Sequence, residues 1–86
     1  MTTARAKYAI ERVTWIDPAS DSGWNRISDL DGKGVAIETV GYVVKETKAS
    51  VCIATSVSEF GKALDPITIP KVNIQRRTRL RCKGKR

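Results

Sequence analysis

The sequence predicts one small, mainly β domain with one short helix, folded as a bent antiparallel sheet or barrel of the SH3-like or Sm-like kind. Three observations support this prediction. The chain has 86 residues, which is enough for a single hydrophobic core. Its apolar residues gather in short runs rich in β-branched and aromatic types, separated by turn-forming residues. These runs do not alternate with long helical segments, as they would in a parallel α/β fold.

The first strand is expected over residues 7–16, where β-branched and aromatic residues are frequent. Its alternation is imperfect, because Ile10 has one parity whereas Val13 and Trp15 have the other. A bulge at residues 11–12 would reconcile the two halves. Of the two tryptophans, Trp15 is expected to pack in the core.

A short helix is expected after a turn at residues 17–23, which are almost all turn-forming types. Trp24, Ile27 and Leu30 recur at three-residue spacing, which would place them on one face of a helix. Asp21 or Ser22 would cap its N-terminus. The core is therefore the first expectation for Trp24, and a stacking surface for nucleic-acid bases is the alternative.

The longest strand is expected over residues 35–46, and it would form a hairpin with residues 50–57. Gly41 lies in the middle of the first of these strands, which is typical of a bulge or a sharp bend. Residues 58–65 are expected to form a loop anchored by Phe60. Residues 66–70 have a proline at each end, which favours an edge strand.

The last strand is expected to end near Cys82. From residue 72 the even positions are Val72, Ile74, Arg76, Thr78, Leu80 and Cys82, and the odd positions from 77 to 83 are Arg77, Arg79, Arg81 and Lys83. Alternate residues of a strand share one face. The pattern therefore predicts an even, largely apolar face toward the core and a ladder of four cations toward solvent.

The positive charge is confined to one end of the chain. The net charge is +7, yet residues 71–86 contain eight cations and no acid, whereas residues 1–70 have a net charge of 8 − 9 = −1. We expect residues 7–82 to form the domain, with residues 1–6 as a flexible N-terminus and residues 83–86 as a frayed basic tail.

The composition argues against an enzyme. The chain has no histidine, which removes the commonest general base and the usual partner of a nucleophilic serine or cysteine. No residue spacing supports a zinc site or a phosphate-binding glycine loop, so we expect no metal and no cofactor. Asp17 and Asp21 could form an acid–base pair, but their place among proline, serine and glycine favours turn and helix capping.

The remaining features favour a protein of the reducing cytoplasm. Cys52 and Cys82 are too few for a disulfide framework of a small secreted domain, so both are expected to be free thiols. No apolar run approaches the roughly 20 residues of a membrane span. The N-terminal residues lack the apolar stretch of a signal peptide.

Four short segments in order resemble a pattern found in small proteins of tailed bacteriophages. They are Trp15-Ile16-Asp17, Ser22-Gly23-Trp24, Val40-Gly41-Tyr42-Val43-Val44-Lys45-Glu46 and Ile69-Pro70-Lys71. The likeness covers about residues 8–74 and leaves out the cationic end. It implies a phage or prophage accessory protein of the host bacterial cytoplasm, and it carries over no catalytic or binding residue.

The cationic end predicts binding to nucleic acid through its phosphate backbone. The candidate contacts are Lys71, Arg76, Arg77, Arg79, Arg81 and Lys83, with Trp24 as a possible stacking residue. Three alternatives remain open: a basic edge that only blocks aggregation, docking on an acidic host protein, and sequestration of a small anionic signal. Edge strands could also join copies of the chain into a homo-oligomer.

Overall fold

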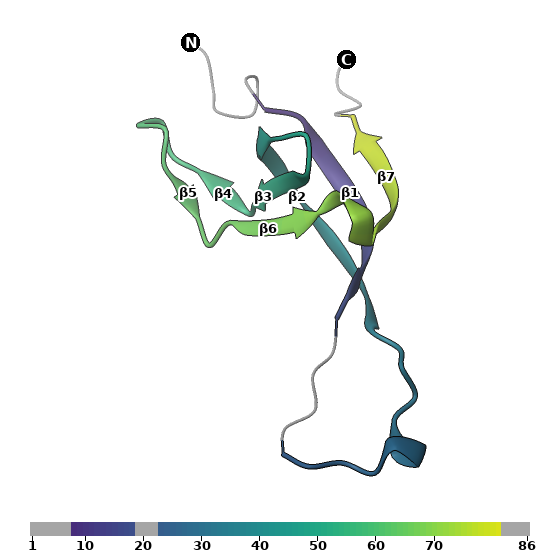
Figure 1. Ribbon diagram of the computed structural model, residues 1–86. Coiled ribbons are helices and arrows are strands. Elements are labelled where there is room, and N and C mark those ends of the chain that lie inside the picture. The colour runs from purple at the N-terminus through teal and green to yellow at the C-terminus, as the bar shows by residue number, and fades with distance from the viewer. Residues whose placement is uncertain (1–7, 19–22, 82–86) are drawn as a thin grey trace.

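The structure is a computed structural model, and it describes residues 8–18 and 23–81 (Figure 1). The elements in chain order are β1 (Ile10–Asp17), η1 (Ile27–Asp29), β2 (Val35–Glu46), β3 (Ser50–Ala54), β4 (Ser56–Val57), β5 (Ala63–Leu64), β6 (Ile67–Pro70), η2 (Lys71–Asn73) and β7 (Ile74–Leu80). The termini expected at residues 1–6 and 83–86 lie outside the described residues.

Five strands form one antiparallel sheet in the order β6-β3-β2-β1-β7, and β4 and β5 form a separate two-stranded ribbon. The two edge strands, β6 and β7, are consecutive in the chain and are joined by the single 3-10 turn η2. The predicted fold class, a small bent antiparallel β structure, is confirmed.

Two β-bulges lie at positions that the sequence did not indicate. β1 pairs with β2 without a break from Ile10 to Asp17, so the bulge expected at residues 11–12 is wrong. One bulge lies instead in β7, where Thr14 and Trp15 face Arg76 and Ile74 and leave Gln75 as the extra residue. The other lies in β2, where Val44 is extra relative to β3. Each inserted residue reverses the parity of the side chains beyond it.

The hydrophobic core is small and lies on the inner face of the sheet. Its buried members are Val13, Trp15, Val51, Ile53 and Ile69, with Ile37, Val43 and Ile74 packed against them. Trp15 is buried, as expected, and its indole Nε1 donates a 3.0 Å hydrogen bond to the Thr39 hydroxyl. This bond satisfies the one polar group that the indole brings into the core.

Gly41 lies where two strands approach each other closely. A Cβ atom at this position would lie 2.6 Å from the Ala54 carbonyl oxygen and 2.7 Å from Cγ2 of Ile53. The glycine therefore permits the close approach of β3 to β2, and the bulge of β2 lies at Val44 and not at the glycine.

The helix expected around residues 24–30 is wrong. Only Ile27–Asp29 form a 3-10 turn, without a side-chain cap, and Figure 1 shows this segment extending away from the sheet. Trp24 and Ile27 are almost fully exposed. A short amphipathic helix depends on packing of its apolar face, and the extended loop brings that face to no part of the core.

The segment after β3 also departs from the prediction in part. The hairpin of β2 and β3 is confirmed, but β3 ends at Ala54 and the following residues pair as β4 with β5. Phe60 is 82% exposed and anchors nothing in the described residues. β6 is an edge strand, as its prolines indicated.

Candidate nucleic-acid interface on the edge strand β7

The bulge at Gln75 decides which way the cations of β7 point. Residues directly opposite each other in an antiparallel pair have side chains on the same face. Arg77 lies opposite the buried Val13, and Arg79 lies opposite Glu11, so both project from the inner face of the sheet. Arg76 lies opposite Thr14 on the outer face. The expected apolar even face toward the core is therefore wrong beyond Ile74.

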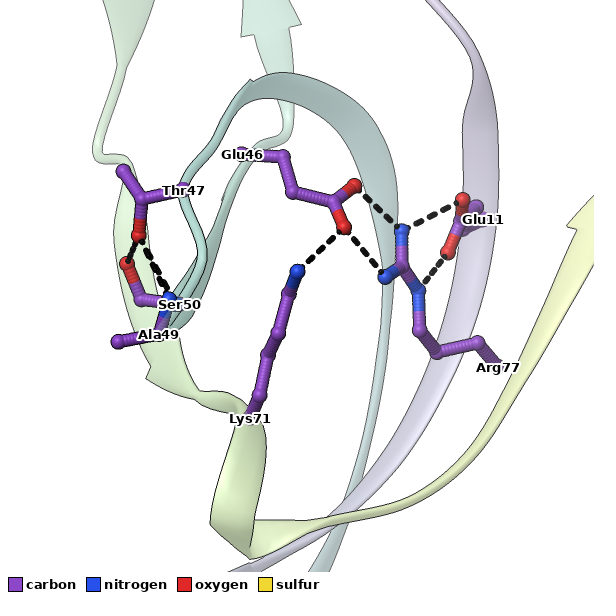
Figure 2. A network of polar contacts seen from close by, with 7 residues as sticks. All are labelled: Glu11, Glu46, Thr47, Ala49, Ser50, Lys71 and Arg77. Carbon is purple, nitrogen blue, oxygen red and sulfur yellow. Dashed lines mark hydrogen bonds and ion pairs between the residues drawn. The ribbon is translucent and has the colours of Figure 1, made fainter.

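Arg77 is held by two carboxylates at the edge of the core (Figure 2). Its Nε and Nη2 donate to Glu11 at 2.7 and 3.0 Å, and its Nη1 and Nη2 donate to Glu46 at 3.0 Å each. The guanidinium thus makes a paired contact with each carboxylate, the strongest geometry that this side chain offers. The side chain of Glu11 is only 13% exposed.

Glu46 reaches this position through two local features. The bulge at Val44 shifts the alternation of side chains by one residue, so that Glu46 projects from the inner face. There it lies opposite the buried Val51. The tight turn that follows is fixed by Thr47, whose hydroxyl accepts hydrogen bonds from the backbone N–H groups of Ala49 and Ser50 (Figure 2). The Glu46 carboxylate is therefore placed between Arg77 and the first residue of η2.

Lys71, the first residue of η2, closes the network. Its Nζ lies 2.7 Å from a Glu46 oxygen, and its backbone N–H donates to the Ala49 carbonyl at 2.8 Å. Lys71, Glu46, Arg77 and Glu11 together form what we call the ionic clasp, which joins β1, β2, η2 and β7. Lys71 and Arg77 were both predicted to contact phosphate; in the structure both form ion pairs with Glu46, and their side chains stay 34% and 29% exposed.

The charges of the clasp stabilise one another. Hydrogen bonds from Arg77 and then from Lys71 lower the pKa of Glu46 from its ordinary 4.5 to about 2. The carboxylates of Glu46 and Glu11 raise the pKa of Arg77 above its ordinary value, so that it stays charged. Glu46 and Arg77 are therefore both charged at neutral pH.

The lowered pKa of Glu46 predicts acid destabilisation in a defined range. The stabilisation from its charged form is present above pH 4.5, the ordinary pKa, and is lost as the pH falls through about 2. The melting temperature should therefore fall more steeply between pH 4.5 and 2 in the native chain than in Glu46→Gln. Thermal unfolding followed by circular dichroism would test this, with Glu38→Gln on the exposed outer face as control. Parallel profiles for the native chain and Glu46→Gln would contradict the role of the clasp.

Three predicted contact residues remain open to solvent. Arg76, Arg79 and Arg81 are exposed, and they make no ion pair with the residues that the structure describes. Glu11 is the residue opposite Arg79, but its carboxylate is already bound by Arg77. The sixth predicted contact, Lys83, lies outside the described residues.

Arg76 and Arg79 lie in β7, and Arg81 directly follows it. Among the residues that the structure describes, β7 pairs with β1 alone, so its other edge is open. Arg76 projects from the outer face and Arg79 from the inner face. Arginine side chains are long enough to turn from either face toward the open side of an edge strand. Among the described residues, the exposed cations of this edge are therefore a row of three arginines that draws on both faces of the sheet.

The structure also bears on the predictions for the cysteines, Trp24, metal sites and membrane spans. Cys52 is a half-buried free thiol, and Cys82 lies outside the described residues. Trp24 is fully exposed, which leaves its indole open to a ligand. In the described part of the chain, no three acidic or cysteine side chains are grouped as metal ligands would be, and no helix is both long and apolar enough to span a bilayer.

No protein-family model, curated protein or solved structure matches this chain. The proposals below therefore rest on the geometry of the sheet edge and on the sequence.

Proposed function

We propose that this chain is a non-enzymatic accessory protein of phage type that binds the phosphate backbone of nucleic acid through Arg76, Arg79 and Arg81. One observation supports this function above all. The three arginines are exposed along a free sheet edge, and no acidic residue follows Asp65 in the sequence. A polyanion that approaches this edge meets cations without competing carboxylates from the same strand.

The spacing of the arginines suits an extended polyanion. Arg79 and Arg81 are two residues apart, and Arg76 and Arg79 are three apart, so a strand rise of about 3.3 Å separates them by roughly 7 and 10 Å. Neighbouring contacts at such separations can engage successive phosphates of one backbone. The planar guanidinium binds phosphate oxygens in pairs, which a lysine cannot do.

The setting of this function follows from the sequence. The four segments that resemble tailed-phage proteins support a role during phage growth in the host bacterial cytoplasm, where nucleic acid is abundant. They do not include β7, so the proposed binding by the arginine row rests on the geometry of the sheet edge and not on this resemblance.

The proposal predicts a loss of binding when the exposed row is neutralised. Arg76→Gln, Arg79→Gln and Arg81→Gln combined should weaken binding to a fluorescent oligonucleotide at least tenfold, because three charge-assisted contacts are removed. Fluorescence anisotropy at low salt measures the affinity. The melting temperature should change little, since all three side chains are exposed.

A matched control removes the same charge elsewhere. Lys45, Lys48 and Lys62 are exposed cations outside β7, and their combined replacement by glutamine gives the same net charge as the arginine variant. This control should retain most of the affinity. Equal losses in the two triple variants would show a mere effect of net charge and would overturn the proposed site.

A second function, docking on a host protein, is favoured by one observation. The loop around η1 presents Trp24 at 104% and Ile27 at 86% of their reference exposures, and the turn η2 presents Val72 at 92%. Exposed aromatic and aliphatic side chains of this kind are typical of protein interfaces. A bacterial protein retained on the chain after nuclease treatment, with no affinity for oligonucleotides, would favour this function over the first.

A further inference from the structure

A groove lies at the base of the projecting loop, directly before the arginine row. It has a volume of about 790 Å³. Its walls are the returning leg of the loop, residues 30–35, and the segment 72–75 that covers η2 and the start of β7, with Ile16 and Pro18 from the end of β1. Arg76 follows immediately after the last groove residue, Gln75, so the arginine row begins where the groove lining ends in the chain.

The lining of the groove combines three kinds of group. Leu30, Val35 and Val72 are apolar and well exposed. Asn73 and Gln75 bring side-chain amides, each with two donor hydrogens and one acceptor oxygen. Lys33 brings a cation to the wall opposite β7. The Asp31 carboxylate, the one acidic group in the lining, accepts a 2.9 Å hydrogen bond from the Lys33 backbone N–H.

The bulge at Gln75 makes this end of β7 available. Gln75 is the extra residue between the two pairs that β7 makes with β1, and its side chain is exposed. A residue in this position is not committed to the sheet ladder and can turn toward a ligand. The bulge thus places an amide between the apolar wall and the first arginine of the row.

This combination matches one chemical class of ligand. An apolar surface covers the face of a base, amides bind the donors and acceptors at its edge, and cations on both sides bind the flanking phosphates. In a duplex the base faces are stacked and the pairing edges are occupied, so only an unpaired base can enter the groove. We infer that the groove binds an unpaired base of a single-stranded nucleic acid whose backbone continues along Arg76, Arg79 and Arg81. This inference rests on the proposed function and adds the choice of single strand over duplex.

The test compares three probes of equal length by fluorescence anisotropy: a single-stranded oligothymidine, an abasic single strand with the same phosphates, and a duplex. The oligothymidine should bind about tenfold more tightly than the abasic strand, the size of about two net hydrogen bonds. It should also bind more tightly than the duplex.

Variants assign this preference to the groove. Asn73→Ala combined with Gln75→Ala should reduce the affinity for oligothymidine to that for the abasic strand and leave the abasic affinity unchanged. Asn25→Ala removes an amide in the loop outside the groove lining and serves as the matched control. Val72→Ser, at a 92% exposed position, gives a second test of the groove that does not depend on the amides.

The outcomes separate this inference from the proposed function. Equal affinities for all three probes, or groove variants that leave the oligothymidine preference intact, would overturn the base-binding groove and leave phosphate binding by β7 standing. No binding to any of the three probes at low salt would overturn the proposed function and the groove together.

Discussion

Replacing Arg77 by methionine is expected to destabilise the fold by about 1–3 kcal/mol, the cost of leaving a largely covered carboxylate without its hydrogen bonds. Glu11 is only 13% exposed and loses both of its guanidinium contacts. Glu46 retains Lys71 but loses its two bonds to Arg77. Chemical denaturation followed by circular dichroism measures the change.

Arg79→Met is the matched control, because it removes the same type of residue two positions along the same strand. Arg79 is exposed, so we expect its loss to change the stability by no more than about 0.5 kcal/mol. The effects on oligonucleotide affinity should be reversed, with a loss for Arg79→Met and little change for Arg77→Met at temperatures where both are folded. Equal stabilities of the two variants would contradict the division of β7 into a structural arginine and binding arginines.

Gly41→Ala is expected to destabilise the protein, although alanine ordinarily suits a strand better than glycine. Backbone entropy alone predicts a gain of about 0.5–1 kcal/mol. The added Cβ atom would lie 2.6 Å from the Ala54 carbonyl oxygen, which belongs to the backbone of a paired strand and cannot move cheaply. Overpacking of this kind costs about 1–3 kcal/mol or more.

The sign of the change in stability therefore distinguishes the steric effect from the entropic effect in Gly41→Ala. A lower denaturation midpoint with an unchanged slope confirms the steric explanation. Ala36→Val, which also enlarges a side chain of β2 but at an exposed position, should leave the midpoint nearly unchanged. A stabilised Gly41→Ala variant would contradict the close approach of β2 and β3.

The sequence predicted the strands well because β-branched runs and turn residues are local signals. The limits of the long strand at residues 35–46, the edge position of β6 and the burial of Trp15 all follow from such patterns. The short helix failed because the spacing of Trp24, Ile27 and Leu30 predicts an apolar face without saying whether the core can reach it.

The face of the sheet from which each arginine of β7 projects could not be predicted from the alternation of apolar and polar residues. One extra residue at Gln75 reverses the face of every side chain that follows it, and glutamine gives no local signal for a bulge. Arg77 thereby turns toward Glu11 and Glu46, which are 66 and 31 residues away in the chain. The pairing of Arg77 with Glu46 could not be predicted either, because Glu46 reaches the inner face only through the second bulge, at Val44.

The salt dependence of binding tests the central claim, that exposed arginines of β7 bind phosphates, most directly. Each phosphate engaged contributes about −0.7 to −0.9 to the slope of log affinity against log salt concentration. The native chain should therefore have a slope steeper by about 2 to 3 than the variant that lacks Arg76, Arg79 and Arg81, by the same rule. Equal slopes for the two proteins, or an affinity that does not change with salt, would contradict it.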